Sequence, residues 1–390
     1  MLIDQPPKLI TYLSPHNGQP LVEHTSQLLS DGDLLWPVVD GIPYLRPKHE
    51  LREQAVYLLE AGRHQEALIL LLQDQDRFAP VAPPDASTVD QLITDVNTIS
   101  LRRAMQMLNY GPVADYFAYR EATPTFLSGL ALLQQIVRAE QPVIEVACGM
   151  GHFLRALEAQ EVTTTGVDVV FSKLWLARRY LGVRGTLVCA DIEGQLPFTT
   201  DRPHSIFCHD AFYFFEYKMD VLSALRTAAS GGNLALGHVH TNAVDHGVAG
   251  FPLSVDTYRQ MAADEARFFD DEQLITDWLQ QQSARVPHHD ELAHSEAVAW
   301  VEGSVNQRPF PLSEPAAPLS LNPLLRVSEI TTEIHWPSER FRQEYQATME
   351  YLQISPKDQA VLLRKEKKMS AEQRAEFFRR RVLLDVPFLW

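Results

Sequence analysis

Between residues 141 and 242, short apolar segments alternate with amphipathic helical segments, and this alternation constrains the fold more than any other feature. Five strands are predicted: Val143–Ala147, Val162–Val167, Gly185–Cys189, Ser205–Cys208 and Asn233–Gly237. Helical sequence separates them, for example Phe153–Leu157 and Ser172–Leu181. Strands that alternate with helices form a parallel sheet with helices on both faces. The sequence therefore predicts a doubly wound α/β core.

Polar side chains occur where these strands end. Glu145, Asp168 and Asp191 are spaced 23 residues apart, which is close to the length of one strand–helix unit. His209–Asp210 and His238 end the last two strands. Ligands bind at the C-terminal edge of an open α/β sheet, at the point where the strand order reverses. We therefore expect a binding site at this edge.

A glycine turn, Gly149-Met-Gly151, follows the first strand and precedes a helix. Such a turn lets a ligand approach the backbone closely, and the helix N-terminus adds a positive end. Dinucleotide enzymes use a similar loop, but Leu154 stands where their third glycine would be. Glu145, just before the turn, would repel a pyrophosphate. A positively charged nucleoside without phosphate fits better, which disfavours a nicotinamide-dependent oxidoreductase.

The sequence resembles the class I S-adenosylmethionine-dependent methyltransferases, which have a Rossmann-like fold. The matching motifs are Glu145-Val-Ala-Cys-Gly-Met-Gly151, Gly166-Val-Asp168, Ala190-Asp-Ile192 and His209-Asp-Ala-Phe-Tyr-Phe-Phe215. The resemblance covers about a third of the chain. Ala147 replaces the usual first glycine of the loop.

This resemblance implies S-adenosylmethionine as the cofactor. The implied cofactor-binding residues are Glu145, Cys148, Gly149, Gly151, Asp168, Val169, Asp191, Ile192 and His209. In this assignment Glu145 lies near the ammonium group, directly or through water. Asp168 accepts hydrogen bonds from the ribose hydroxyls, and Asp191 accepts one from the adenine amino group.

A hydroxyl acceptor requires a base that removes its proton, and a histidine titrates near neutral pH. The candidate catalytic residues are His209, Asp210, His238 and His240, with His246 further along the chain. Because His238 and His240 lie on one strand, one of them could instead point into a helix layer as a hydrogen-bonded core residue. Eight aromatic residues could line the sulfonium and acceptor pocket by cation–π contact, but core packing explains most of them equally well, so only about two are expected in the pocket. They are Tyr110, Tyr116, Phe117, Tyr119 and Phe212 to Phe215.

Four regions are predicted along the chain. A small β-rich module spans residues 1–48, a helical hairpin with its linker spans 49–88, and the cofactor-binding core spans 89–242. Residues 243–390 form a substrate-capping region. This last region is expected to be mainly helical, with strands at Glu329–Trp336 and Asp358–Arg364.

The β-rich module resembles the small zinc-ribbon family that activates some methyltransferases, chiefly through Trp36-Pro-Val-Val-Asp-Gly-Ile-Pro-Tyr44. Ser14 and His16 stand where that family has a cysteine pair, so we expect a module without metal ligands. The hairpin resembles a single tetratricopeptide unit, and one unit cannot build a solenoid. Packing against neighbouring elements is therefore favoured over a peptide-binding array. The module and the hairpin are the candidate surfaces for a protein partner.

The last helix is expected to begin at Ser370-Ala-Glu-Gln373, which has the pattern of a capping box. Its arginines, Arg374, Arg379, Arg380 and Arg381, alternate with apolar residues. This pattern favours a solvated face opposite a packed stripe over a binding site for an anionic partner.

The net charge of −16 disfavours non-specific binding to nucleic acid, because such binding needs Lys and Arg side chains that neutralise the phosphates. Three scattered cysteines favour buried reduced thiols over disulfides or structural zinc. No segment approaches the length that spans a bilayer, so we expect a cytoplasmic protein.

The predicted function is methylation of an oxygen or nitrogen on a small-molecule or glycan-like acceptor. The alternatives are a non-catalytic scaffold that binds S-adenosylmethionine and, less favoured, a nicotinamide-dependent oxidoreductase.

Overall fold

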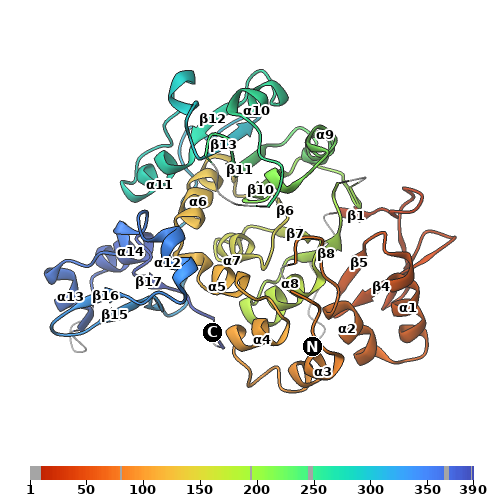
Figure 1. Cartoon of the computed structure of the whole chain (residues 1–390). Coiled ribbons are helices and arrows are strands. Elements are labelled where there is room, and N and C mark those ends of the chain that lie inside the picture. The colour runs from red at the N-terminus through yellow and green to blue at the C-terminus, as the bar shows by residue number, and fades with distance from the viewer. Residues whose placement is uncertain (1–9, 80, 194–195, 245–248, 364–368, 388) are drawn as a thin grey trace.

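The computed structural model describes residues 10–79, 81–193, 196–244, 249–363, 369–387 and 389–390. An 11-stranded sheet runs through its centre in the order β12-β13-β11-β10-β6-β7-β8-β5-β4-β3-β2 (Figure 1). Its five inner strands are parallel: β6 (Val143–Val146), β7 (Thr164–Asp168), β8 (Thr186–Ala190), β10 (Ser205–His209) and β11 (Leu234–His240). The predicted doubly wound α/β core is confirmed.

The strand order reverses beside β6. From β6 the chain moves outward to β7 and β8 on one side, and later to β10 and β11 on the other. The connecting helices are α7 (His152–Glu158), α8 (Phe171–Leu176) with its π-helical continuation Ala177–Leu181, and α9 (Lys218–Ala229). A crevice is expected at such a reversal, outside the carboxyl ends of the strands.

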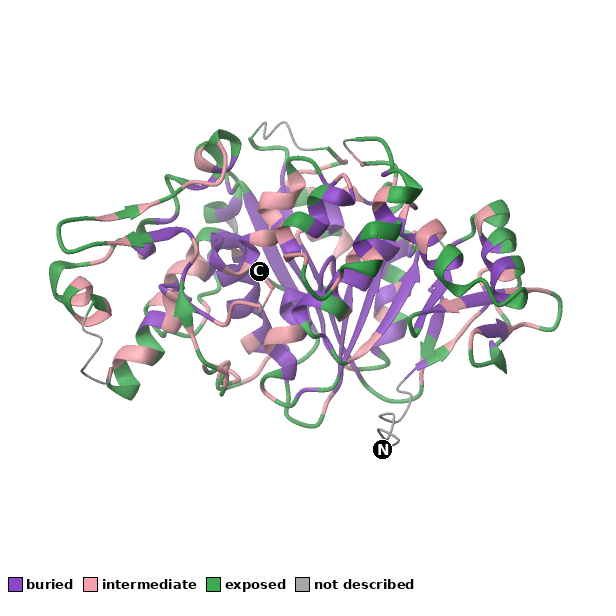
Figure 2. Cartoon of the chain, turned by 90° about the horizontal axis from the view of Figure 1, so that it is seen from below, coloured by how far each residue is buried: buried purple, intermediate pink, exposed green. Residues whose placement is uncertain are grey.

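Alternate residues of each inner strand face opposite sides of the sheet. In β10, Ile206 and Cys208 join a hydrophobic cluster that contains α9, whereas Phe207 joins one that contains α6 (Pro124–Ile136). All five residues of β10 are buried, as expected for a parallel strand covered on both faces. Figure 2 shows the buried strands crossing the middle of the molecule, with exposed residues on the outer helices and loops. Cys148, Cys189 and Cys208 are buried free thiols, as predicted.

The N-terminal strands continue the central sheet. Strands β2 (Val22–Thr25), β3 (Leu28–Ser30), β4 (Leu35–Val39) and β5 (Ile42–Leu45) form an antiparallel meander. Strand β5 then pairs in parallel with β8, with Tyr44 opposite Cys189. Strand β1 (Ile10–Tyr12) pairs instead with the distant β9 (Phe198–Thr200). Local turn signals cannot reveal such long-range pairing.

Asp31 organises the part of this meander where the sequence lacks a cysteine pair. The Ser14 hydroxyl and the Trp36 indole both donate to Asp31 Oδ2. Its Oδ1 accepts from the backbone N–H of Leu34 at 2.7 Å. The Asp31 carboxylate thus connects the segment before β2 with the turn between β3 and β4 and with β4 itself.

Helices fill the segment between the meander and β6. The predicted hairpin is confirmed as α1 (His49–Glu60) and α2 (His64–Leu72). It is followed by α3 (Ala86–Thr94), α4 (Leu101–Met107) and α5 (Val113–Ala118), which precede α6. Helix α2 packs against α3 and α8, so the hairpin lies against the core. None of the described helices is long and apolar enough to cross a membrane.

The prediction of a mainly helical C-terminal region is wrong in one important respect. Strands β12 (Arg267–Asp270) and β13 (Ala297–Glu302) join the central sheet, β13 lying antiparallel to β11. Every residue of β13 is buried. A strand buried on both faces has no polar alternation, and its apolar run cannot be told from a buried helix by periodicity. Helices α10 (Val255–Met261) and α11 (Asp271–Leu279) complete this part.

The strand predicted at Asp358–Arg364 is also wrong, because Pro356–Leu363 forms helix α13. Pro356 occupies its first turn, and the Ser355 hydroxyl accepts from the backbone N–H of Asp358, which together start a helix. The other predicted strand contains β16 (Thr332–Ile334), which pairs with β15 (Leu325–Val327). The remaining elements are α12 (Glu339–Tyr345), β14 (Ser320–Leu321) and β17 (Leu383–Leu384).

Helix α14 (Ala371–Arg379) begins at Ser370 with both hydrogen bonds of the predicted capping box. The expectation that its arginines share a solvated face fails for Arg381, which is 2% exposed. The guanidinium of Arg381 lies over the rings of Phe378 and Phe126. Arg381 therefore helps to attach the C-terminal region to α6.

Candidate active site

A cavity of about 1530 Å³ lies at the C-terminal ends of all five parallel strands. Its walls come from four further parts of the chain that are far apart in sequence. The loop 75–79 and α5 form one side, α12 contributes a second, and the start of α11 contributes a third. The side chains predicted at the strand ends therefore line one cavity.

The glycine turn forms the floor of this cavity. Ala147, Gly149 and Gly151 all have left-handed backbone, with φ of 54°, 56° and 72°. A Cβ on Gly149 would lie 2.9 Å from the ring of Phe117, so only glycine leaves this space open. Gly151 does not line the cavity. It precedes α7 in a conformation that favours glycine, which explains its place in the motif.

Glu145 presents a buried carboxylate to the cavity. It is 3% exposed, and its Oε2 has no hydrogen-bond partner among the described residues. Burial raises its pKa well above the usual value, although the charge of Arg120 opposes this shift. A buried carboxyl oxygen without a hydrogen-bond partner destabilises the folded protein unless a ligand donates a hydrogen bond to it.

Asp168 ties the glycine turn to the neighbouring strand. Its Oδ2 accepts from the backbone N–H of Gly149 at 2.8 Å, and its Oδ1 accepts from that of Val170 at 2.9 Å. Lys173 Nζ lies 3.8 Å from Oδ1. A carboxylate offers about four acceptor positions, so Asp168 retains capacity for a ligand.

Asp191 follows the next strand and is exposed at the far end of the cavity. Its Oδ1 accepts from the backbone N–H of Glu193 at 3.0 Å. Ile192 beside it is buried. Cys148, Val169 and Ile192 all line the cavity, together with the three carboxylates.

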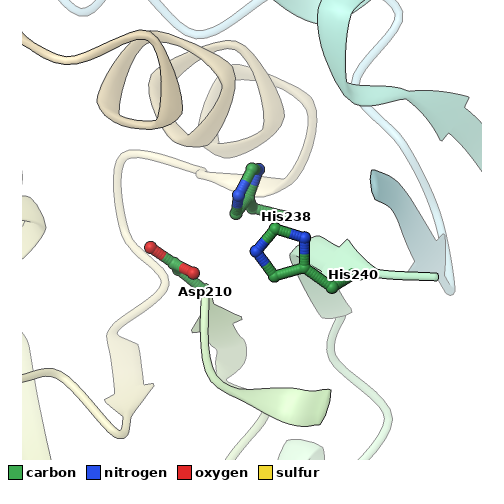
Figure 3. Close-up of side chains that lie close together, drawn as sticks. All are labelled: Asp210, His238 and His240. Carbon is green, nitrogen blue, oxygen red and sulfur yellow. The ribbon is translucent and has the colours of Figure 1, made fainter. Parts of the chain in front are cut away.

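Asp210, His238 and His240 meet at the opposite end of the cavity, where β10 and β11 end (Figure 3). One potential ligand atom from each lies within 4.8 Å of the others. Tyr116 and Tyr213 donate to the two oxygens of Asp210 at 2.6 and 3.0 Å. Burial acts to raise the pKa of Asp210, but the charges of His238 and Arg120 hold it at about 2.

A bulge in β11 decides where both histidines point. Leu234 and Leu236 face the cluster that contains α9, so regular alternation would bury residues 238 and 240 there. The pairing of β11 with β13 shifts between Leu236 and Val239, and Val239 occupies the cluster instead. Both histidines line the cavity. His246 lies outside the described residues.

His238 is held by a carboxylate that the sequence analysis missed. Its Nδ1 lies 2.8 Å from Oδ2 of Asp271, the first residue of α11. Burial disfavours the imidazolium, but the charges of Asp271 and Asp210 raise the pKa of His238 to about 9. Asp271 follows a strand that the sequence did not reveal, so no local signal marked it.

His209 is packed differently from the other two histidines. Arg120 donates to its Nδ1 at 3.2 Å, because a guanidinium can only donate. The Cβ of an alanine at Gly129 or Gly237 would lie within 3 Å of the imidazole, so two glycines make room for it. Burial and the charge of Arg120 lower the pKa of His209 to about 3.

Arg120 is the second residue that the sequence analysis missed. It is 4% exposed and also lies 3.5 Å from Oδ2 of Asp210, with its guanidinium over the ring of Tyr116. It belongs to a short 3-10 segment between α5 and α6 that carries no motif. Of the eight predicted aromatic residues, six line the cavity: Tyr110, Tyr116, Phe117, Tyr213, Phe214 and Phe215. Tyr119 and Phe212 pack elsewhere, against Trp390 and Trp300.

His152, the first residue of α7, is expected to make the protein acid-sensitive. Burial and the charges of Arg120 and Arg155 lower its pKa to about 3, against about 6.5 when unfolded. Between these values the unfolded chain binds more protons, so the free energy of unfolding falls as pH drops below 6.5. His152 alone is expected to cost about 2 kcal/mol between pH 7 and pH 5.

Urea denaturation across this pH range tests the expectation. The variant His152→Gln keeps an N–H donor and cannot titrate, so its unfolding free energy should fall less steeply toward pH 5. The exposed His24 offers a matched control, and His24→Gln should follow the wild type. Equal slopes for His152→Gln and the wild type would contradict the buried neutral state of His152.

Comparison with known proteins assigns a family model to the centre of the chain. Residues 143–232 match the model of a methyltransferase domain. No curated protein sequence matches the chain significantly. Solved structures match at low identity. A chain from the complex between the Haloferax volcanii Trm112 methyltransferase activator and the putative methyltransferase is 16% identical, with a TM-score of 0.37. That match covers 51% of the present chain and 96% of the other.

Two further solved structures are similar to about half of the chain. The plantazolicin methyltransferase BpumL, solved in complex with a monoazolic desmethylPZN analog and SAH, is 14% identical with a TM-score of 0.37. This match covers 57% of the present chain and 100% of that protein. A putative methyltransferase from Bacillus halodurans C-125 is 17% identical with a TM-score of 0.32, covering 45% and 96% of the two chains. The matched methyltransferase domain at residues 143–232 is thus the segment that carries the glycine turn and its three carboxylates.

Proposed function

We propose that this chain is an S-adenosylmethionine-dependent methyltransferase. The observation that carries the proposal is that Glu145, Gly149, Asp168 and Asp191 all line a single cavity, with Asp168 hydrogen-bonded to the backbone of Gly149. The unpartnered Oε2 of Glu145 suits an ammonium group, and the missing Cβ of Gly149 leaves room for a ligand beside Phe117. The domain match over residues 143–232 supports the same reading.

Each carboxylate has a distinct role in this proposal. Glu145 binds the ammonium group of the methionine portion. Asp168 accepts from the ribose hydroxyls while it holds the glycine turn, and Asp191 accepts from the adenine amino group beside Ile192. Bound in this way, the cofactor supplies a methyl carbon activated by a sulfonium. The chain's own task is then to align the acceptor about 3 Å from that carbon.

The acceptor atom lies against Asp210, His238 and His240 in this proposal, at the end of the cavity away from Asp191. We propose an oxygen or nitrogen acceptor on a small-molecule or glycan-like compound. His209 acts as a positioning residue, because its Nδ1 accepts from Arg120 and thereby fixes the guanidinium beside Asp210. The exposed edge strand β2 supports the option of a protein partner at the N-terminal module.

Calorimetric titration of a variant at the exposed Asp191 tests the cofactor assignment. Asp191→Ala loses a single hydrogen bond to the cofactor, worth about 1–1.5 kcal/mol, so the Kd for S-adenosylmethionine should rise roughly tenfold. Asp220 is an exposed carboxylate on α9 outside the cavity, and Asp220→Ala should bind as the wild type does. Equal affinity in all three proteins would refute the role of Asp191.

Transfer itself is measured with S-adenosylmethionine labelled on its methyl group. The chain is incubated with fractionated cell extract, and a labelled small molecule or glycan is expected in one fraction. Binding without any labelled product would favour the scaffold alternative over an enzyme.

A further inference from the structure

One carboxylate and two imidazoles, all groups that can bind metal ions, meet at one point of the cavity wall in Asp210, His238 and His240. A carboxylate oxygen and two imidazole nitrogens lie within 4.8 Å of one another. Figure 3 shows the three side chains turned toward a common space between the ends of β10 and β11. His240 is buried, and the other two are largely buried but reach the cavity. Unlike a surface cluster, this one has little bulk water to solvate its charges.

The backbone is strained to bring these side chains together. Asp210 has φ of 57° and His238 has φ of 45°, both in the left-handed region that side chains other than glycine rarely adopt. Each such residue costs about 1 kcal/mol or more, and strain of this kind concentrates at functional sites. The bulge that holds His238 in this conformation is also what turns His240 away from the hydrophobic cluster.

The neighbours of the cluster are arranged as they are around metal ligands. The Asp271 carboxylate is hydrogen-bonded to Nδ1 of His238 at 2.8 Å, so Nε2 is the nitrogen that can bind a ligand in the cavity. Ligating histidines commonly bind a carboxylate through their other nitrogen, which fixes the ring orientation. Two tyrosine hydroxyls orient Asp210 in the same way.

The local charge balance leaves room for a divalent ion and an anionic acceptor. Asp210 and Asp271 supply two negative charges, and Arg120 supplies one positive charge at 3.5 Å from Asp210. A divalent ion on two neutral imidazoles would leave one positive charge in excess. An acceptor oxygen bound without its proton would cancel this excess.

We propose that Asp210, His238 and His240 bind a divalent transition-metal ion that in turn binds the methyl acceptor through oxygen. Two imidazoles and one carboxylate suit ions such as Zn²⁺, Mn²⁺, Co²⁺ or Fe²⁺ better than Mg²⁺ or Ca²⁺. Three protein ligands leave coordination positions open for an acceptor.

The chemical step, which rests on the proposed methyltransferase function, balances without a further reactant. The ion lowers the pKa of the bound hydroxyl, whose O–H bond breaks and releases the proton to water in the cavity. An oxygen lone pair then forms the bond to the methyl carbon. The C–S bond breaks, and its electron pair returns to sulfur as a neutral thioether. This step requires an oxygen acceptor. A vicinal diol or a hydroxy acid would occupy two open coordination positions of the ion.

Cobalt binding tests the site without reference to activity. The full-length chain is freed of metal with a chelator and titrated with Co²⁺, whose visible ligand-field bands report imidazole and carboxylate ligation. One Co²⁺ per chain is expected for the wild type, and the bands should be lost in His238→Ala and His240→Ala. Asp271→Asn should weaken Co²⁺ binding by about 10-fold or more, because His238 is still present but loses the carboxylate that orients its ring.

His294 provides the matched control, since it lines the same cavity outside the cluster, and His294→Ala should titrate as the wild type does. Circular dichroism and thermal denaturation establish that each variant is folded. Absence of stoichiometric Co²⁺ binding in the wild type, or equal binding in His240→Ala and His294→Ala, would overturn the proposal. Because S-adenosylmethionine binding is measured separately on Asp191→Ala, a protein that binds the cofactor but no Co²⁺ would refute the metal site alone.

Discussion

Replacing Glu145 with glutamine is expected to weaken S-adenosylmethionine binding and at the same time to stabilise the ligand-free protein. A hydrogen bond to a charged group contributes about 1.5–3 kcal/mol, so the Kd should rise roughly 10- to 100-fold. The stability gain follows from burial. The pKa of Glu145 is raised when folded, so ionisation above the unfolded value near 4.3 costs stability as pH increases. Glutamine removes this cost. Calorimetry and thermal denaturation at pH 8 measure the two effects.

Glu158 is a matched control because it is also a buried glutamate, but one with a complete set of partners. It accepts from the Thr164 hydroxyl at 2.7 Å and from the backbone N–H groups of Arg184 and Gly185 at 2.8 Å. Glu158→Gln should therefore lower the melting temperature and leave the Kd unchanged. If Glu145→Gln behaved in the same way as Glu158→Gln, Glu145 would be a structural residue and not a ligand-binding one.

Asp168→Ala is expected to have the largest effect on the cofactor site, because the carboxylate holds the glycine turn and, in the proposed function, also accepts from the ribose hydroxyls. Its loss leaves the N–H groups of Gly149 and Val170 without their acceptor, at about 1–3 kcal/mol each. S-adenosylmethionine affinity should fall at least about 100-fold, since two charged hydrogen bonds to the ribose are lost as well. Urea denaturation and calorimetry measure the two losses.

A cofactor analogue without ribose hydroxyls separates the two roles of Asp168. If the ribose contact is real, wild type and Asp168→Ala should differ much less for this analogue than for S-adenosylmethionine. Asp277 provides the stability control, since it is 2% exposed and accepts from the backbone N–H of Arg285 at 2.8 Å. Asp277→Ala should lose stability but keep its cofactor affinity. An equal loss of affinity for both ligands in Asp168→Ala would limit its role to holding the turn.

The central strands and their polar ends could be predicted because they depend on local sequence. Most inner strands are short, largely apolar runs bounded by turn residues, and helices within the same segment cover them. Asp168 and Asp191 follow such runs directly, so their place at one edge of the sheet follows from the parallel arrangement alone.

The outer strands could not be predicted in the same way. Strand β13 is an apolar run without alternation, and β1 pairs with a strand that lies nearly 190 residues further along the chain. Helix α13 contains a β-branched and apolar run, yet Ser355 and Pro356 start a helix there. In each case a distant partner or a cap outweighed the local pattern.

The alternating core, the glycine turn and its neighbouring carboxylates follow from residue spacing, because the length of a strand–helix unit sets these positions. The end of the cavity that Asp210, His238 and His240 line depends on long-range packing. Arg120 and Asp271 reach it from segments without a motif, and the bulge at His238 turns both histidines out of the hydrophobic cluster. These features arise from the packing of elements far apart in the chain, and nothing in the spacing of neighbouring residues encodes them.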